Sequence, residues 1–194
     1  MHEVRSPALK QFELQSIADI AKAQGKDGVD AFLDLTLQDD LEIEFTLSTF
    51  NHRVDRMKEI LNNRDILIGL GDGGAHVDML CDSGYPTYLL GTWVREHQAL
   101  TLEEGVRRLT SDPADFYGIK DRGRLKPGLA ADIAIFDPHT VGSSNRGERR
   151  YDLPGGAKRM VMPSRGVLYT IVNGTCMFAD GGLTDARAGR VLRS

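Results

Sequence analysis

A single carboxylate follows an apolar segment in a way that could do acid–base chemistry. Residues 66–70 form a short apolar run, and Asp72 comes next, between Gly71 and Gly73. Such a run is typical of a buried parallel strand, and reactive groups collect at the C-terminal ends of parallel strands. There a carboxylate can take a proton from water and pass it to a leaving group. A second interpretation stays open, in which Asp72 only closes a turn.

The glycine-rich loop after this carboxylate carries further polar side chains. His76 could contact a substrate or brace the loop, and Tyr85 could line a pocket or pack against the protein. Four potential metal ligands also occur here: His76, Asp78, Cys81 and Asp82. Their spacing matches no structural zinc pattern, so we do not expect an independent metal site in this loop.

Composition excludes several classes of protein. The chain has 194 residues, 41% of them hydrophobic, which is enough for a real core. A formal charge of −4 with scattered basic residues does not indicate binding to nucleic acid or anionic membranes. The glycines at 71–74 lack the lysine of a phosphate-binding loop. Without a signal peptide or a membrane-length apolar run, and with two cysteines in unrelated contexts, we expect a reduced, cytoplasmic protein.

The first part of the chain, residues 1–118, reads as helices alternating with short strands. Apolar spacing predicts helices over 14–21, 29–33 and 54–61, and further helices begin at Pro86, Thr101 and Ser111. Strands are expected at 42–48 and 66–70. This order predicts a parallel sheet covered by helices.

Residues 119–194 are glycine-punctuated and predict a small β-rich domain. Strands are expected at 132–136, 167–172 and 175–178, with a turn at Asn173-Gly174. Residues 142–160 are polar and predict a long surface loop, whose arginines we expect to be solvated. We expect Asp132 to hydrogen-bond local backbone rather than to do chemistry.

An ordered series of short motifs resembles the C-terminal part of amidohydrolase-superfamily enzymes of the N-acyl-D-amino-acid deacylase (D-aminoacylase) type. The motifs cover residues 71–76, 93–96, 100–104, 107–110, 118–123, 127–132, 136–138, 172–174 and 188–193. The resemblance implies an α/β fold: the C-terminal portion of a (β/α)8 TIM-like metallo-dependent hydrolase barrel, followed by part of a small β-sandwich domain.

The same resemblance implies a function. Such enzymes hold one or two divalent metals, usually zinc, and use a metal-activated water to hydrolyse non-peptide C–N bonds. By position Asp72 would be the catalytic proton shuttle and would face the metal, while His76 and Tyr85 would contact the substrate. The implied substrate is an N-acyl-D-amino acid.

The chain departs from that family in two ways. The His-x-His pair after the first strand and the later metal ligands are absent, and only the last two barrel strands can be placed. Residues 77–85 also lack the arginine that would grip a substrate carboxylate. We therefore expect a C-terminal segment of a longer enzyme that is inactive by itself. It would associate with another copy or with the missing barrel segment. The alternative is a barrel remnant that acts as an oligomerisation or scaffold domain.

Overall fold

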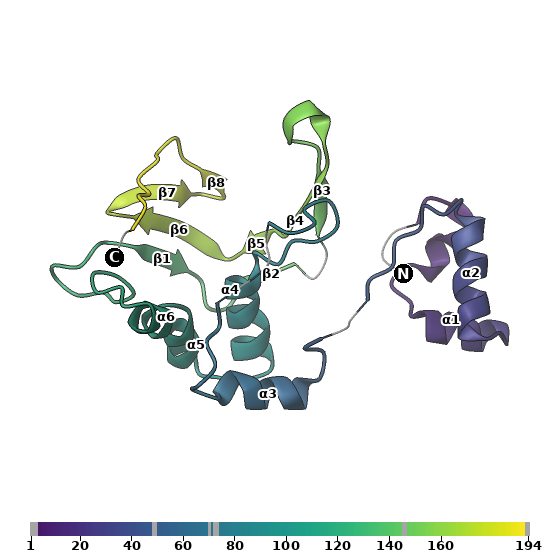
Figure 1. The fold of residues 1–194 in the computed structure, drawn as a ribbon, viewed down its shortest axis with the longest axis horizontal. Helices are drawn as coiled ribbons and strands as arrows, with labels where there is room; N and C mark the ends of the chain where they lie inside the picture. Colours follow the sequence, from purple (N-terminus) through teal and green to yellow (C-terminus); the bar gives the residue numbers. More distant parts are fainter. Residues whose placement is uncertain (1–3, 48–49, 70, 72–73, 145–146, 193–194) are drawn as a thin grey trace. The chain divides into compact units, whose positions relative to one another are not determined.

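The computed structural model describes residues 4–47, 50–69, 71, 74–144 and 147–192 (Figure 1). The chain divides into two compact units, one that ends at Val54 and one that begins at Asp55. The predicted boundary at residue 118 is a different division of the chain and stays a prediction.

The first unit is a small helical cluster. Its elements are η1 (Pro7–Phe12), α1 (Ile17–Gln24) and α2 (Gly28–Gln38). Ser16 caps α1 by accepting a hydrogen bond from the Asp19 N–H at 3.1 Å, and Asp27 caps α2 through the Val29 N–H at 2.8 Å. The core of this unit consists of Val4, Leu9, Ile20, Leu35 and Ile43.

Two expectations for this unit need correction. The first α-helix begins at Ile17, and Leu14 lies before it, exposed and with a φ of 67°. Apolar spacing alone placed the start too early, because the N-cap at Ser16 is what sets the first residue of the helix. Over residues 42–47, the predicted strand is reduced to one bridge at Glu44.

The helices of the second unit follow the prediction closely. They are α3 (Val54–Asn62), α4 (Tyr85–Tyr88), the π-helical η2 (Leu89–Glu96), α5 (Leu102–Leu109) and α6 (Ser111–Phe116). Pro86 lies in the first turn of α4, as predicted, and Thr101 caps α5 through the Glu104 N–H at 3.2 Å. Their shared core is Leu61, Leu89, Trp93 and Leu100.

The C-terminal strands form an antiparallel sheet in the order β1-β6-β7-β8. The strands are β1 (Ile133–Phe136), β6 (Val167–Val172), β7 (Thr175–Ala179) and β8 (Gly182–Leu183). The predicted turn is confirmed: Asn173 and Gly174 both have positive φ, 47° and 79°, as a two-residue hairpin requires.

Asp132 ties the start of β1 to that turn. Its Oδ1 accepts a hydrogen bond from the Asn173 N–H at 2.7 Å, and its other oxygen forms an ion pair with Arg122. Burial by itself would raise the pKa of Asp132, but the Asn173 bond and Arg122 together outweigh it and hold that pKa below its usual value. We expected Asp132 to bond backbone close to it in sequence, and this was wrong. Its backbone partner, Asn173, lies 41 residues away.

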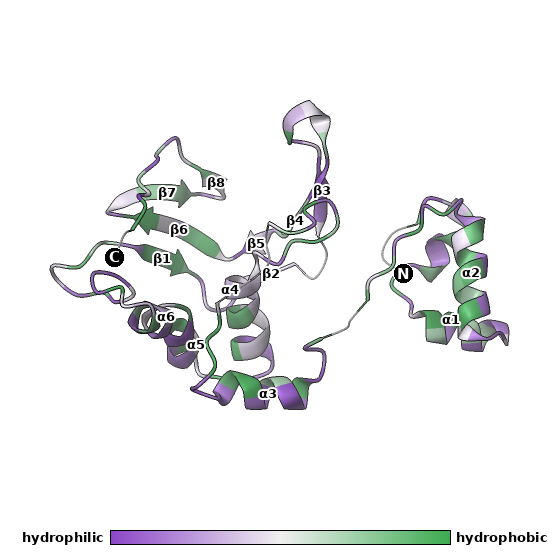
Figure 2. Ribbon diagram, viewed as in Figure 1, coloured by the Kyte–Doolittle hydropathy of each residue, from purple (hydrophilic) through white to green (hydrophobic). Residues whose placement is uncertain are grey.

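The expected long polar loop contains β-structure instead. β2 (Gly142–Ser143) pairs with β5 (Ser164–Arg165), and β3 (Glu148–Arg150) pairs with β4 (Arg159–Val161), with η3 (Pro154–Gly156) between the latter two. Figure 2 shows why hydropathy gave no strand signal here, because β3 is hydrophilic whereas β1 and β6 are hydrophobic. Gly142 and Ser143 are buried rather than solvated.

The predicted parallel sheet is not seen in the part of the chain that the structure describes. Residues 66–69 have no strand pairing, and all paired strands between residues 133 and 183 are antiparallel. A parallel strand exists only beside a partner strand, and among the described residues, 66–69 have none. Across the described residues, no helix has the length and apolar character that a membrane crossing demands.

Candidate active-site segment

Asp72, predicted to be the catalytic and metal-facing carboxylate, lies outside the described residues. The structure does describe the residues on either side, namely 66–69, Gly71 and 74–85. Their contacts define how the protein holds the segment that carries Asp72.

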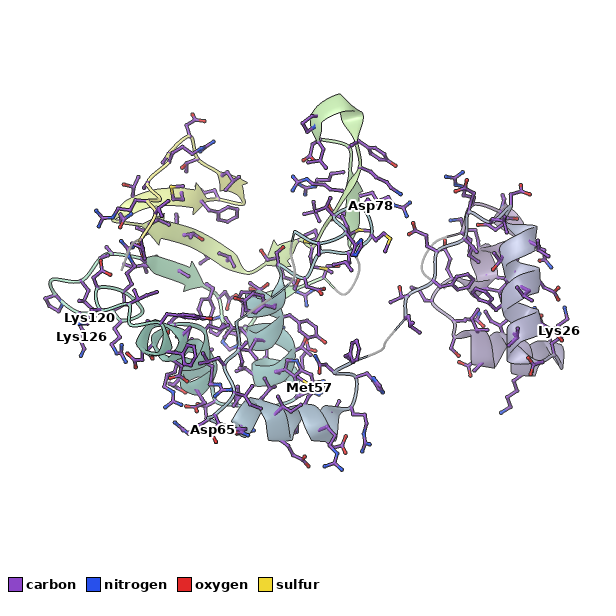
Figure 3. All side chains as sticks on the ribbon, viewed as in Figure 1. Lys26, Met57, Asp65, Asp78, Lys120 and Lys126 are labelled. Atoms are coloured by element: carbon purple, nitrogen blue, oxygen red, sulfur yellow. The ribbon has the colours of Figure 1, made fainter. Side chains whose placement is uncertain are left out.

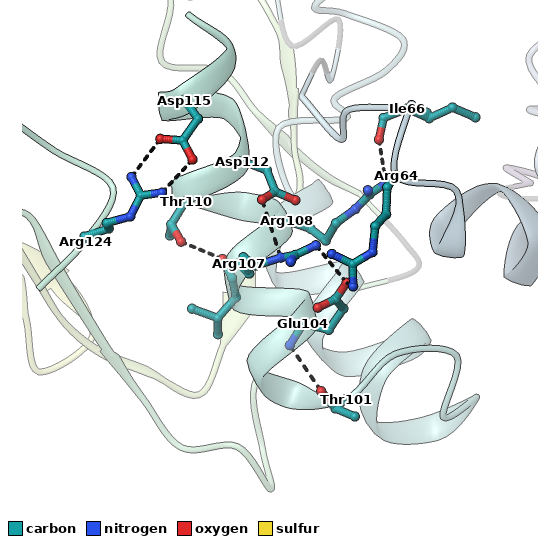
Figure 4. A network of polar contacts seen from close by, with 11 residues as sticks. Arg64, Ile66, Thr101, Glu104, Arg107, Arg108, Thr110, Asp112, Asp115 and Arg124 are labelled. Atoms are coloured by element: carbon teal, nitrogen blue, oxygen red, sulfur yellow. Dashed lines mark hydrogen bonds and ion pairs between the residues drawn. The ribbon is translucent and has the colours of Figure 1, made fainter. Parts of the chain in front are cut away.

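Arg108 anchors the start of this segment. This α5 arginine is only 2% exposed, and its Nη2 donates a hydrogen bond to the Ile66 carbonyl oxygen at 2.6 Å (Figure 4). A bond from a charged donor is shorter and stronger than one between neutral groups. In a sheet, a neighbouring strand would donate a hydrogen bond to the Ile66 carbonyl. Here the Arg108 side chain donates it instead.

Tyr85 holds the end of the same segment. Its hydroxyl donates a hydrogen bond to the Gly69 carbonyl oxygen at 3.3 Å. A Cβ at Gly71 would lie 2.5 Å from the Asp82 carbonyl oxygen and 2.9 Å from Tyr85 Cδ1, so only glycine fits there. Tyr85 thus packs against the residues that flank Asp72, and its predicted contact with substrate stays a prediction.

His76 shapes the turn of the loop. It is exposed, with a φ of 47°, and its carbonyl oxygen accepts hydrogen bonds from the N–H groups of Met79 at 2.8 Å and Leu80 at 3.1 Å. These contacts brace the loop, and they are made by the backbone of His76 rather than by its side chain. The predicted role of the imidazole in substrate binding stays a prediction.

The rest of the loop does not assemble a metal site from described residues. Cys81 Sγ lies 3.0 Å from Ser83 Oγ, and this hydrogen bond lowers the pKa of the Cys81 thiol. Asp78, labelled in Figure 3, is exposed. Among the described residues, no three His, Cys, Asp or Glu side chains come together in a way that could hold a metal ion.

A network of ion pairs lies on α5 next to Arg108 (Figure 4). Glu104 accepts from Arg107 at 3.0 Å and from Arg64 at 3.1 Å, and Arg107 also lies 3.4 Å from Asp112. These charges tie α5 to the chain just before the active-site segment and to the start of α6. They are partly exposed, so each pair adds little stability.

The sequence analysis did not assign a role to Arg108. A usable signal exists on its own helix, because Arg108 follows Gly105 by three residues and therefore shares its face. A Cβ at Gly105 would lie 2.7 Å from Val94 Cγ2, so this face packs tightly on η2. An arginine on a face that needs glycine is a candidate for a buried, structural role.

Comparisons with known proteins show the family to which this chain belongs. The protein-family model described as "Amidohydrolase family" matches residues 3–178. The N-acyl-D-glutamate deacylase of Alcaligenes xylosoxydans is 37% identical over 107 residues, which are 55% of this chain and 20% of that protein. The dihydroorotase of Lactobacillus acidophilus is 47% identical over 45 residues, 23% of this chain and 11% of that protein.

A solved structure extends the similarity to nearly the whole chain. The N-acyl-D-glutamate deacylase of Bordetella bronchiseptica, crystallised with zinc and a phosphonate mimic of the tetrahedral intermediate, aligns with a TM-score of 0.53 at 29% identity. The alignment covers 98% of this chain and 36% of that one.

The fold is therefore a mixed α/β segment related to N-acyl-D-amino-acid deacylases, and it spans about a third of the length of the solved relative. The chain belongs to the amidohydrolase family, as its motifs indicated.

Proposed function

We propose that this chain is the C-terminal segment of a metal-dependent, cytoplasmic amidohydrolase that hydrolyses non-peptide C–N bonds, with N-acyl-D-amino acids as substrates. The observation that carries the proposal is the 37% identity with an N-acyl-D-glutamate deacylase over 107 residues. In this proposal residues 1–118 belong to the last part of a (β/α)8 barrel and residues 119–194 to a small β-sandwich domain.

Asp72 is the residue of this chain that moves a proton in the proposed reaction. Its carboxylate takes a proton from the attacking water and returns it to the leaving amine. The role of Arg108 and Tyr85 is to hold the backbone before Asp72, through the Ile66 and Gly69 carbonyls. Both anchors lie on helices, which hold a reacting group more accurately than loops do.

The described residues do not by themselves provide a zinc site, because no donor set of three comes together among them. Zinc in proteins is held by three or four side chains. We propose that the ligands other than Asp72 come from the part of the enzyme that the relatives have beyond this segment.

A domain exchange tests the proposal. The matching segment of an active N-acyl-D-glutamate deacylase is replaced by this chain, and hydrolysis of N-acyl-D-glutamate is measured with zinc present. We expect turnover that falls at least about 10³-fold in Asp72→Asn, with the zinc content reported separately by elemental analysis.

Asp78→Asn is the matched control, because Asp78 is an exposed aspartate of the same loop. It should keep most of the turnover. A folded chimera that is inactive before any substitution, or one whose turnover survives Asp72→Asn, would contradict the proposal. Strong turnover by the isolated 194-residue chain would contradict the need for outside ligands.

A scaffold or oligomerisation role is the second candidate, and exposed apolar side chains on α2 favour it. Val29, Leu33 and Leu37 are 65%, 49% and 66% exposed. This candidate predicts self-association without turnover in the chimera.

A further inference from the structure

A small polar pocket lies between η2 and the β2–β5 pair, and no role in the proposed hydrolysis is assigned to it. Its volume is about 130 Å³. Two arginines line it, Arg95 from η2 and Arg165 from β5, together with Thr92, Glu96 and Ser143. A pocket with two guanidinium groups and little apolar surface suits a charged ligand rather than a hydrophobic one.

Glycines let both guanidinium groups lie against the backbone. A Cβ at Gly142 would lie 3.3 Å from Arg165 Nε, and a Cβ at Gly91 would lie 3.3 Å from Arg95 Nη2. The two glycines also adjoin, since that Gly91 Cβ would come within 2.9 Å of Gly142 Cα. The two cationic groups therefore flank one close contact between η2 and β2.

The charges that line this pocket do not cancel. Arg95 Nη2 lies 3.4 Å from Glu96, and Arg95 also donates to the carbonyl oxygens of Val141 and Pro138. Arg165 is exposed, and it forms no ion pair with any described residue. The two arginines and one glutamate leave the pocket with one net positive charge.

Ser143 lines the pocket without offering its hydroxyl to it. The residue is only 8% exposed, and its Oγ has no hydrogen-bond partner among the described residues. The Oγ is closed to solvent and lies against Gly84, where a Cβ would come within 2.5 Å of it, so Arg95 and Arg165 are the groups that can contact a ligand in the pocket.

We propose that this pocket binds a small oxyanion, a phosphate or a carboxylate group, with Arg165 as the main contact. Guanidinium groups bind both kinds of oxyanion through paired, charge-assisted hydrogen bonds. Arg95 adds positive charge while holding the 138–141 backbone, and Glu96 opposes binding. The inference goes beyond the proposed hydrolysis, and its test measures binding alone.

The test is calorimetric titration of the 194-residue chain with inorganic phosphate and, separately, with acetate at low ionic strength. We expect Arg165→Met to weaken the better-bound anion about 10-fold or more, because methionine keeps much of the aliphatic stem and removes the charge. Glu96→Gln should tighten binding by about 3-fold or more, because it removes the opposing charge. The comparison of the two anions shows which oxyanion the pocket prefers.

Arg150→Met is the matched control, because Arg150 is an exposed arginine of the same unit on β3. It should leave anion affinity unchanged. Absence of binding to the original chain, or equal affinity in Arg165→Met and Arg150→Met, overturns the proposal. If Arg165→Met does not fold, Glu96→Gln decides, and an affinity that does not rise counts against the pocket.

Discussion

Arg108 is the residue whose role the structure changes most. Burying a guanidinium is costly unless its donors find acceptors, and Arg108 gives one of them to the Ile66 carbonyl at 2.6 Å. Its Nε has no partner among the described residues, so the bond to Ile66 offsets only part of that cost. Arginine suits this position because its side chain is long enough to reach from α5 to the Ile66 carbonyl, which lies outside any strand.

Replacing Arg108 tests this role. We expect Arg108→Met to lower the free energy of unfolding by about 2 kcal/mol, because it leaves the Ile66 carbonyl without its charged donor. Urea unfolding followed by fluorescence measures this, because Trp93 is the chain's single tryptophan and lies in the core of the second unit.

Arg107→Met is the control on the same helix. Arg107 forms partly exposed ion pairs with Glu104 and Asp112, which contribute roughly 0–1 kcal/mol. Equal losses for the two variants would contradict the anchoring role of Arg108.

Asp132 makes stability depend on acid. Because the pKa of Asp132 is lowered in the folded protein, its contribution is present above the unfolded value of about 3.9 and is lost as the pH falls through the folded pKa. We expect Asp132→Asn to be less stable than the original by about 1 kcal/mol at pH 6, with a smaller difference at pH 3.

Chemical denaturation at the two pH values measures that difference. The other carboxylates with lowered pKa, among them Asp115 and Asp137, are present in both proteins, so their effect cancels. A difference between the proteins that is the same at both pH values would contradict a role for the Asp132 charge.

At the scale of elements, short-range signals predicted the helices well and the strand at 66–70 badly. Pro86, Thr101 and Ser111 act through their own helix turns, so sequence spacing suffices to locate the starts of α4, α5 and α6. A strand exists only through a partner, and residues 66–69 have none among the described residues. The run is hydrophobic as expected, but hydrophobicity alone cannot tell whether a partner strand is present.

The candidate site was predictable in the same uneven way. The motif order identified the family and pointed to Asp72, which lies outside the described residues. A buried role for Arg108 could be inferred from its helix face, but its partner could not be, because 42 residues separate it from Ile66. The same holds for Tyr85, whose hydroxyl bonds the Gly69 carbonyl.

The cap of α5 can be tested directly. Thr101 accepts a hydrogen bond from the Glu104 N–H, so Thr101→Ala should cost about 1 kcal/mol of stability, whereas Thr101→Ser should retain most of it. Urea unfolding monitored by Trp93 compares the two variants. Equal losses would mean that the methyl group of Thr101, rather than its hydroxyl, stabilises the helix.

At the scale of the whole molecule, α2 presents an apolar stripe to solvent. Val29, Leu33 and Leu37 follow one another by four residues and therefore share one helix face, while Ala31 and Leu35 are buried. Exposed contiguous apolar surface marks interaction sites. We expect the purified chain to self-associate through this face.

Light scattering and sedimentation velocity test this association over a range of concentrations. The double variant Leu33→Lys/Leu37→Lys should shift the chain toward monomer, because a charged face resists burial. Lys22→Glu on α1 is a control that changes charge without removing apolar surface. A monomeric original chain at all concentrations would refute the expectation.

The bond between Arg108 and the Ile66 carbonyl has a thermodynamic consequence. A molecule that binds and stabilises the backbone at Ile66 should also protect α5 against opening, because the two are linked through this contact. By reciprocity, whatever loosens α5 will weaken ligand affinity at that backbone. Amide exchange in α5 should therefore report ligand binding next to Ile66.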